Sequence, residues 1–501
     1  MPLFDRILIA NRGEIAVRLL RACRELGISP VAVYSEVDRE ALHVRLADEA
    51  ILLGPAAPAE SYLNMEKVIA AALQSGAAAV HPGYGFLSEN AGFARRAAAA
   101  GLVFIGPPPG AIDAMGDKAA ARVLMQSSGV PVVPGVQDVA DDKALAKAAK
   151  DIGFPVLVKA AAGGGGKGMR VVNASADLLE SAAAARREAL NAFGDDRLIL
   201  EKYVARGRHV EIQVLADQHG NTVHLFEREC SVQRRHQKII EETPSPLLDD
   251  DLRSAMGDAA VAAAQAVGYT NAGTVEFIVD PDTRAFYFLE MNTRLQVEHP
   301  ITEAITGLDL AQWQIRIAAG ERLPFQQADL TPHGHAIECR LYAEDPATGF
   351  LPSTGTLLAF DLPSGPGVRV DSGVTEGSEI SVHYDPLMAK LIVHAGDRPA
   401  ALRRMQTALS ETVVLGVTTN REFLLDVLQH PVFAAGEATT RFIEEHLPNW
   451  RPATSVPPAA LIAAALAELR APASSNGATP AADADPYSPW ARPTGFRMGG
   501  G

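Results

Sequence analysis

Two glutamates lie on neighbouring strands of a predicted β-hairpin and could hold a metal ion. The segment 274–290 predicts two strands, rich in aromatic and β-branched residues, around an Asp-Pro-Asp turn. We expect Glu276 to face Phe288, with Glu290 as its diagonal neighbour on the same face and Asn292 continuing that parity. Carboxylate and amide oxygens are the ligands that Mg²⁺ prefers and shares with nucleotide phosphates. The hairpin therefore predicts a magnesium site, and an ordinary solvated face is the alternative.

A glycine-rich segment, residues 163–168, lies between the predicted strands 156–159 and 169–172. Consecutive glycines let backbone N–H groups approach phosphate oxygens. The dinucleotide-binding fingerprint requires a helix after the glycines, and here a strand follows. The Walker pattern also fails, because Gly168 follows Lys167 where Ser or Thr is required. The segment predicts a flexible hairpin tip that closes over a nucleotide, and a mobile linker is the alternative.

Two irregular polar segments carry further candidates. Residues 229–238 form the strongest cationic run of the chain, and fixed cations bind phosphate oxygens and small anions. Residues 292–300 mix Arg, Gln, Glu and His without helical or strand periodicity. Irregular polar backbone beside paired acids is typical of a functional site. A solvated charged loop is the alternative for residues 229–238.

These residues must be positioned by several units. Over residues 6–120, apolar runs alternate with amphipathic stretches, which predicts a doubly wound parallel sheet with helices on both faces. The segment 107–110 interrupts that pattern. Residues 121–332 predict an α+β unit, residues 334–446 a third unit of strands that closes with two helices, and residues from 451 onward a disordered tail. The expected strands of the first unit are residues 7–10, 31–34, 50–53, 78–81 and 102–105. The expected helices are residues 14–26, 65–74, 118–128, 175–193, 251–267, 399–410 and 420–429.

Composition narrows the class of protein. The 501 residues are 48% hydrophobic and 21% charged, which is typical of a globular protein of roughly two to four domains. A formal net charge of −15 argues against broad binding of nucleic acid or of an acidic membrane. The three cysteines are few and far apart, and the N-terminus shows no export signal, so we expect a cytoplasmic protein. No apolar run approaches the ~18 residues that a membrane span needs.

Taken together and in order, the motifs resemble the biotin carboxylase family of ATP-grasp enzymes over about residues 3–447. The motifs that carry the resemblance are Ile9–Ala16, His81–Asn90, Met115–Lys118, Gly163–Gly168, Ser231–Lys238 and Glu290–Pro300. The resemblance implies an N-terminal domain at 1–117, an ATP-grasp domain at 118–332 with a lid at about 131–203, and a biotin carboxylase C-terminal domain at 333–447. Residues 448–501 would be a Pro/Ala-rich linker or the truncated start of a following domain.

The resemblance also implies a role for each matching residue. For ATP the implied residues are Lys118 and Lys159 at the phosphates, Gly165 and Gly166 in the lid, Glu201 and Lys202 at the adenine, and His209, Gln233 and His236 at the ribose or phosphates. The implied ligands of Mg²⁺ or Mn²⁺ are Glu276, Glu290 and Asn292. The implied bicarbonate site consists of Lys238, Arg294, Gln296 and the backbone of Val297, with Glu298 as the general base. Arg340 would stabilise the biotin enolate and Tyr84 would contact the biotin ring.

The implied reaction is the ATP- and bicarbonate-dependent carboxylation of biotin. A base takes the proton of bicarbonate, bicarbonate attacks the γ-phosphate, and carboxyphosphate releases CO₂ to the biotin enolate. The chain holds no Met-Lys-Met tripeptide and no domain for carboxyl transfer. We therefore expect a separate biotin carrier and a carboxyltransferase subunit as partners, in a homodimer or a larger complex.

The tail refines this expectation. Residues 486–498 resemble the start of the segment that follows biotin carboxylase in α-subunits of acyl-CoA carboxylases, so we expect a truncated or split α-subunit. Three alternatives remain open at this point. They are another ATP-grasp ligase, a nicotinamide oxidoreductase built on residues 163–168, and a catalytically silent scaffold.

Overall fold

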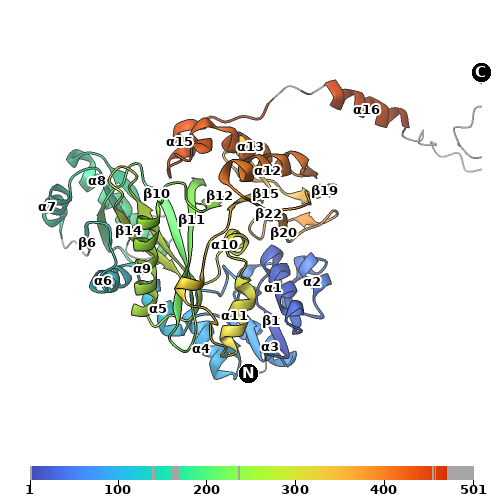
Figure 1. The fold of residues 1–501 in the computed structure, drawn as a ribbon, viewed down its shortest axis with the longest axis horizontal. Coiled ribbons are helices and arrows are strands. Elements are labelled where there is room, and N and C mark those ends of the chain that lie inside the picture. Colours follow the sequence, from blue (N-terminus) through green and yellow to red (C-terminus); the bar gives the residue numbers. More distant parts are fainter. Residues whose placement is uncertain are drawn as a thin grey trace, which may run out of the picture. The chain divides into compact units, whose positions relative to one another are not determined.

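The computed structural model describes residues 3–137, 141–160, 169–234, 237–453, 456 and 458–470. Residues 1–450 form one compact unit and residues 451–501 form a second (Figure 1). Among the described residues, no helix combines the length and the apolar character that a membrane crossing requires.

The N-terminal part is a five-stranded parallel sheet in the order β3-β2-β1-β4-β5. Its strands are β1 Arg6–Ile9, β2 Ser29–Ser35, β3 Glu49–Gly54, β4 Ala79–His81 and β5 Val103–Phe104. Its helices are α1 Gly13–Glu25, α2 Leu42–Leu46, α3 Met65–Gln74 and α4 Ala91–Ala99. Ile7 and Ile9 pack into the core with α1, whereas Leu8 packs into the opposite core with α3 and α4. Both faces of the sheet are therefore covered, and the doubly wound prediction is confirmed.

An eight-stranded antiparallel sheet forms the centre of the molecule. Its strands are β10 Arg208–Ala216, β11 Thr222–Arg234, β12 Gln237–Thr243, β13 Asn271–Val279, β14 Phe286–Asn292, β15 His335–Tyr342, β20 Val368–Ser372 and β22 Leu387–Ala395. Their order is β14-β13-β10-β11-β12-β15-β22-β20. Because β12 pairs with β15, one hydrogen-bonded sheet runs through the ATP-grasp and C-terminal regions that the sequence predicts as separate units.

A smaller sheet in the order β6-β9-β7-β8 stands at one end of the compact unit (Figure 1). Its elements are β6 Gly135–Gln137, α7 Asp142–Ile152, β7 Val156–Ala160, β8 Arg170–Val172, α8 Leu178–Phe193 and β9 Leu198–Lys202. Helix α7 was absent from the expected helices, because only Leu145, Ala148 and Ala149 form its buried face and small residues give a weak periodic pattern. The glycine-rich segment, residues 163–168, lies outside the described residues. The strands on either side of it, β7 and β8, pair antiparallel, as a hairpin requires.

The remaining elements cover the large sheet and its C-terminal end. The helices are α5 Pro109–Gly116, α6 Lys118–Ser127, α9 Asp250–Ala266, α10 His299–Thr306, α11 Leu310–Ala318, α12 Arg398–Glu411, α13 Arg421–Gln429, α14 Pro431–Ala434 and α15 Phe442–His446. Three two-stranded ladders pair β16 Glu344–Asp345 with β17 Leu351–Pro352, β18 Gly355–Thr356 with β21 Glu379–Ile380, and β19 Ala359–Asp361 with β23 Val413–Leu415.

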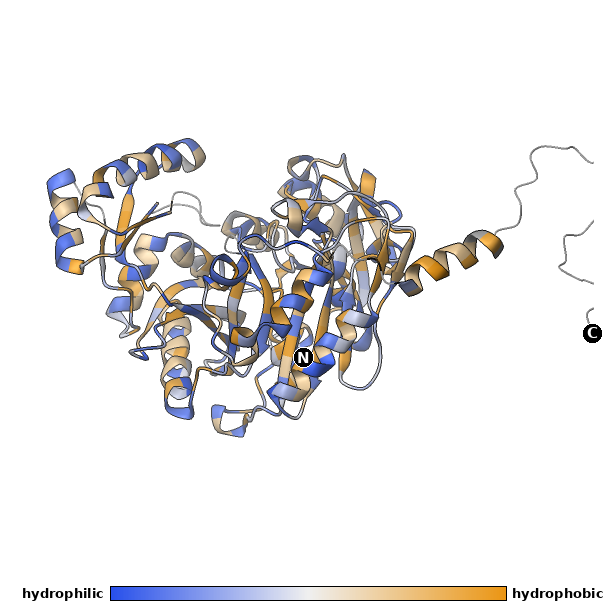
Figure 2. Ribbon diagram, turned by 90° about the horizontal axis from the view of Figure 1, so that it is seen from above, coloured by the Kyte–Doolittle hydropathy of each residue, from blue (hydrophilic) through white to orange (hydrophobic). Residues whose placement is uncertain are grey.

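The tail departs from the expectation of disorder in one segment. Residues Pro458–Arg470 form helix α16, which is rich in alanine and leucine and therefore has a high intrinsic helix propensity. Figure 2 shows α16 as a mostly hydrophobic helix, whereas the helices of the compact unit mix polar and apolar residues.

Candidate active site

Two cavities adjoin each other on the central sheet. The larger has a volume of about 820 Å³ and the smaller about 610 Å³, and His209 lines both. The predicted residues that line the larger cavity are Tyr84, His209, Lys238, Glu276, Glu290, Asn292, Arg294, Gln296, Val297, Glu298 and Arg340. The predicted residues that line the smaller cavity are Glu201, Lys202, His209 and Gln233, together with apolar residues such as Leu157, Ile278 and Leu289.

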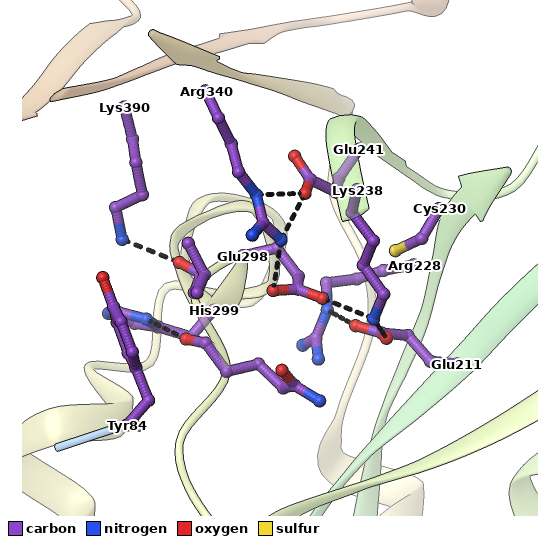
Figure 3. Close-up of polar contacts among 12 residues, drawn as sticks. Tyr84, Glu211, Arg228, Cys230, Lys238, Glu241, Glu298, His299, Arg340 and Lys390 are labelled. Carbon is purple, nitrogen blue, oxygen red and sulfur yellow. Dashed lines mark hydrogen bonds and ion pairs between the residues drawn. The ribbon is translucent and has the colours of Figure 1, made fainter. Parts of the chain in front are cut away.

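Lys238 on β12 lies at the centre of the charged cluster in the larger cavity (Figure 3). Its Nζ is 2.8 Å from Oε1 of Glu276 and 2.8 Å from Oε1 of Glu298, and it also pairs with Glu211. Burial alone would lower the pKa of Lys238, but these three carboxylates raise it well above its ordinary value. Lys238 is therefore a fixed ammonium group that can face a small anion.

Glu298 is fully buried just before α10. Its second oxygen lies 3.0 Å from the guanidinium of Arg340. Burial alone would raise the pKa of Glu298, but Lys238, Arg340 and Arg228 hold it well below its ordinary value. Glu298 is thus a carboxylate at neutral pH, which is the state that a proton acceptor needs.

Arg340 on β15 is buried and donates from Nε to Oε1 of Glu241 at 2.6 Å. Burial would lower its pKa, yet Glu241 and Glu298 raise it well above its ordinary value. The pKa of Glu241 itself is raised to about 7, chiefly because that carboxyl group is buried. Arg340 is therefore not a surface residue but faces the cavity between Glu241 and Glu298.

The two acids of the hairpin, Glu276 and Glu290, lie directly opposite each other and not diagonally as predicted. A bulge between Glu276 and Phe277 places Glu276 directly opposite Glu290, where the sequence predicted Phe288. Phe288 instead pairs with Phe277. The prediction of a diagonal pair was therefore wrong, because the period of a regular strand cannot reveal an inserted residue.

The donor set at this hairpin fits a hard divalent cation. Glu276 is buried, which would raise its pKa, but Lys238 and His209 hold that pKa well below its ordinary value. Asn292 donates from Nδ2 to Oε1 of Glu276 at 2.8 Å, so its amide lies beside the acid. An ionised carboxylate, a second carboxylate and an amide oxygen on adjacent strands are the oxygen ligands that Mg²⁺ prefers.

The segment after the hairpin reaches the same cavity. The guanidinium of Arg294 donates to Oε1 of Gln296 at 2.9 Å and to Oδ1 of Asn292 at 3.0 Å. Its Nε donates to Oε2 of Glu89 at 3.0 Å, which ties this segment to the N-terminal part. Arg294 and Gln296 therefore stand beside the paired acids, as expected for residues that contact an anion there.

The lysines that the sequence assigns to ATP are paired with different acids. Lys118 lies 3.0 Å from Oε2 of Glu290, and Lys159 lies 2.6 Å from Oε2 of Glu201. Glu201 is also paired with Arg122 at 2.5 Å, so its buried carboxylate is neutralised inside the wall of the smaller cavity. Lys202 donates to the carbonyl oxygen of Gly153 at 2.9 Å.

Three of the residues predicted to bind ATP, namely Gly165, Gly166 and His236, lie outside the described residues. Gln233 and His209 do lie together, with Gln233 Nε2 at 2.7 Å from His209 Nδ1.

Several residues of the charged cluster were not predicted from the sequence. Glu211 on β10 lies directly opposite Glu276 on β13. Arg228 forms an ion pair with Glu211, and Glu241 forms one with Arg340. One signal was available for Glu211, since His209, Glu211 and Gln213 alternate with apolar residues, which is the pattern of a strand. The others depend on the register between strands that are distant in sequence.

Models of three families match consecutive parts of the chain. Residues 3–112 match the "Biotin carboxylase, N-terminal domain", residues 117–326 the "Carbamoyl-phosphate synthase L chain, ATP binding domain", and residues 338–445 the "Biotin carboxylase C-terminal domain".

The curated relatives include proteins longer than this chain and proteins that the chain covers completely. The chain is 51% identical to the mitochondrial methylcrotonoyl-CoA carboxylase subunit alpha of Dictyostelium discoideum, over 98% of this chain and 70% of the relative. It is 54% identical to the same subunit of Oryza sativa, of which it covers 60%. It is 52% identical to biotin carboxylase 2 of Bacillus subtilis, over 89% of this chain and 100% of the relative. The chain thus covers biotin carboxylases fully but only about 60–70% of these α-subunits.

A solved structure shares the fold and carries ligands. It is the biotin carboxylase domain dimer of the 2-oxoglutarate carboxylase of Hydrogenobacter thermophilus, in complex with MgADP, ADP and bicarbonate. That domain is 48% identical, with a TM-score of 0.86 over 90% of this chain and 100% of the domain.

Proposed function

The chain belongs to the biotin carboxylase family and carboxylates biotin with ATP and bicarbonate, and we propose which of its residues carry out each step. The observation that carries the assignment is a single cavity lined by an ionised Glu298, a cationic Lys238 and the paired acids Glu276 and Glu290. This combination can bind an anion, remove its proton and hold a divalent cation beside it.

The first step uses the anion site. Lys238, Arg294, Gln296 and the backbone N–H of Val297 bind bicarbonate, and Glu298 accepts its proton. Both carboxylate oxygens of Glu298 already face cations, so the acid is held in its charged form until bicarbonate arrives. A positioned base of this kind contributes about 10²–10⁴-fold to the rate.

The second step transfers the phosphoryl group. An oxygen of bicarbonate attacks the γ-phosphorus, the bond to ADP breaks, and carboxyphosphate forms. Glu276, Glu290 and Asn292 would hold Mg²⁺ or Mn²⁺, which supplies charge neutralisation at the phosphates.

The nucleotide itself is held by the smaller cavity and its lid. Lys118 and Lys159 bind phosphates, Gly165 and Gly166 cover them, and the segment at Glu201 and Lys202 receives the adenine against apolar walls. The remaining contacts to the ribose or phosphates come from His209, Gln233 and His236.

The third step forms the carbon–nitrogen bond. Carboxyphosphate breaks down to CO₂ and phosphate, the released phosphate takes the ureido N–H proton of biotin, and the nitrogen of the resulting enolate attacks CO₂. The buried guanidinium of Arg340 stabilises the enolate oxygen, and Tyr84, which lines the same cavity, contacts the biotin ring.

The larger assembly is part of the proposal. A biotin carrier domain or protein delivers biotin, a carboxyltransferase subunit uses the carboxylated product, and the chain forms a homodimer or joins a larger complex. The match to α-subunits supports a place in an acyl-CoA carboxylase, with the chain as the biotin carboxylase part of such a subunit. Its three cysteines are free and buried, which suits a reducing compartment such as the cytoplasm.

The test is ATP cleavage by the purified chain. We expect it to require bicarbonate and to rise with free biotin, and Glu298→Gln should lower kcat by about 10²–10⁴-fold. Glu242→Gln is the matched control, since Glu242 is buried in the same sheet but pairs with His335 and Arg398. A rate of ATP cleavage that does not depend on bicarbonate would favour another ATP-grasp ligase. If the chain were a catalytically silent scaffold, Glu298→Gln would not change that rate.

A further inference from the structure

Lys390 is a fully buried lysine that the steps above do not use. It lies on β22, directly opposite Arg340 on one side and Asp371 on the other. Burial alone would lower the pKa of Lys390, but Glu14, Glu338 and Asp371 raise it, so the group is a buried ammonium. A buried ion pair is weak evidence for stability, because apolar residues of similar volume often serve the fold as well.

The ammonium of Lys390 holds the backbone of the proposed bicarbonate site. Its Nζ donates to the carbonyl oxygen of Val297 at 2.7 Å. The preceding carbonyl, that of Gln296, lies 2.7 Å from Nδ1 of His299. Two consecutive carbonyl groups of an irregular segment are therefore fixed by buried side chains, and the second belongs to the peptide that joins Val297 to Glu298.

The same lysine is connected through Glu14 to Tyr84, which lines the larger cavity. Oε2 of Glu14 lies 3.3 Å from Nζ of Lys390, and Oε1 accepts the hydroxyl of Tyr84. Glu14 lies on the first turn of α1, which closely approaches Gly373, the residue that follows β20. A continuous polar chain thus runs from Tyr84 through Glu14 and Lys390 to Val297.

We infer that Lys390 is a positioning residue for the bicarbonate step, and that Glu14 links this position to the biotin contact at Tyr84. The inference rests on the proposed function. Lys390 lines neither of the two cavities. It holds the peptide between Val297 and Glu298 in the orientation that presents the backbone of Val297 and the carboxylate of Glu298 to the same anion. A displacement of about 1 Å at such a segment can cost on the order of 10²-fold in rate.

The first test compares Lys390→Met with the wild-type chain in ATP cleavage at varied bicarbonate and varied ATP. We expect kcat/KM for bicarbonate to fall by about tenfold to a hundredfold, while KM for ATP stays at the wild-type value. Arg398→Met is the matched control, because it removes a cation from another buried carboxylate of the same sheet, Glu242. The control should lower stability without changing the bicarbonate dependence.

A second variant separates positioning from folding. Lys390→Met leaves Glu14 without its cation, whereas the double variant Lys390→Met/Glu14→Gln removes both charges. We expect the double variant to melt at a higher temperature than Lys390→Met, because no unpaired charge remains. Its kcat/KM for bicarbonate should stay as low as that of Lys390→Met. Wild-type bicarbonate kinetics in either variant would overturn the inference, because Lys390 would then be only a counter-charge.

The link to Tyr84 has its own readout. Glu14→Gln keeps the contact between Lys390 and Val297, so KM for free biotin should rise while KM for bicarbonate stays unchanged; an unchanged KM for biotin would refute the link. The wild-type assay distinguishes the two levels of proposal. If wild-type cleavage does not need bicarbonate, the proposed function fails; if it does and Lys390→Met behaves as wild type, only the inference fails.

Discussion

At the scale of single residues, the site is a buried cluster in which each charge sets the state of its neighbours. Lys238 keeps Glu298 ionised, and Glu298, Glu276 and Glu211 keep Lys238 protonated. The carboxylates have other cationic neighbours as well, since Arg228 pairs with Glu211. A change at one member therefore alters the charge of the rest.

Lys238→Gln follows from this arrangement. Removal of the ammonium leaves three buried carboxylates short of one cation, so the free energy of unfolding should fall by about 3 kcal/mol. The pKa of Glu298 should move back toward its ordinary value, KM for bicarbonate should rise and kcat should fall. Binding of a fluorescent ATP analogue should persist, because Lys238 does not line the smaller cavity. An equal loss of nucleotide affinity would contradict the assigned role.

His43 gives a pH dependence of stability that does not involve the predicted site residues. It is fully buried, and burial lowers its pKa from 6.5 to about 4. Between these two values the unfolded chain binds a proton that the folded chain excludes, so stability falls as pH falls from 7 to 4. The contribution of this residue is about 3 kcal/mol. In thermal melts across that range, His43→Gln should flatten the dependence and the exposed control His446→Gln should not; identical slopes for all three proteins would refute the assignment.

Eleven of the residues that line the larger cavity were predicted from the sequence, because they fall in local motifs. The sequence did not identify Glu241, Glu14 or Lys390, which contact those residues, nor Arg228, which pairs with Glu211. Each of these contacts joins elements that are distant in the sequence, and no local period reports how such elements align. The site could therefore be predicted as a set of residues but not as a network.

At the scale of elements, small irregularities decide the geometry. The bulge after Glu276 turns a diagonal pair of acids into a direct one. The helices and strands themselves were largely predictable: α3 was expected at 65–74 and spans Met65–Gln74. Bulges and the small-residue helix α7 were not, because they leave little trace in the hydrophobic pattern.

Gly373 is the element-scale position to test. A Cβ there would lie 2.4 Å from the backbone nitrogen of Glu14, so an alanine must displace the start of α1. We expect Gly373→Ala to lower stability by about 1–3 kcal/mol and to raise KM for biotin, because Glu14 moves with α1. At the control Gly396→Ala the new Cβ would meet no described atom within 4 Å. Equal melting temperatures for the two variants would show that α1 is free to shift.

At the scale of the whole molecule, both cavities are lined by residues of the compact unit 1–450. A chain that ends after residue 453 should therefore keep the bicarbonate-dependent cleavage of ATP, the response to free biotin and the main melting transition. Loss of any of these on truncation would show that the tail contributes to the site.

The ladder between β12 and β15 has a practical consequence for anyone dividing this protein. A cut near residue 333 would leave each fragment with a long, bare strand edge, and such edges recruit foreign strands and precipitate. The nucleotide-binding fragment and the C-terminal fragment would then need to be co-expressed, so that β12 and β15 can pair as soon as both fragments fold.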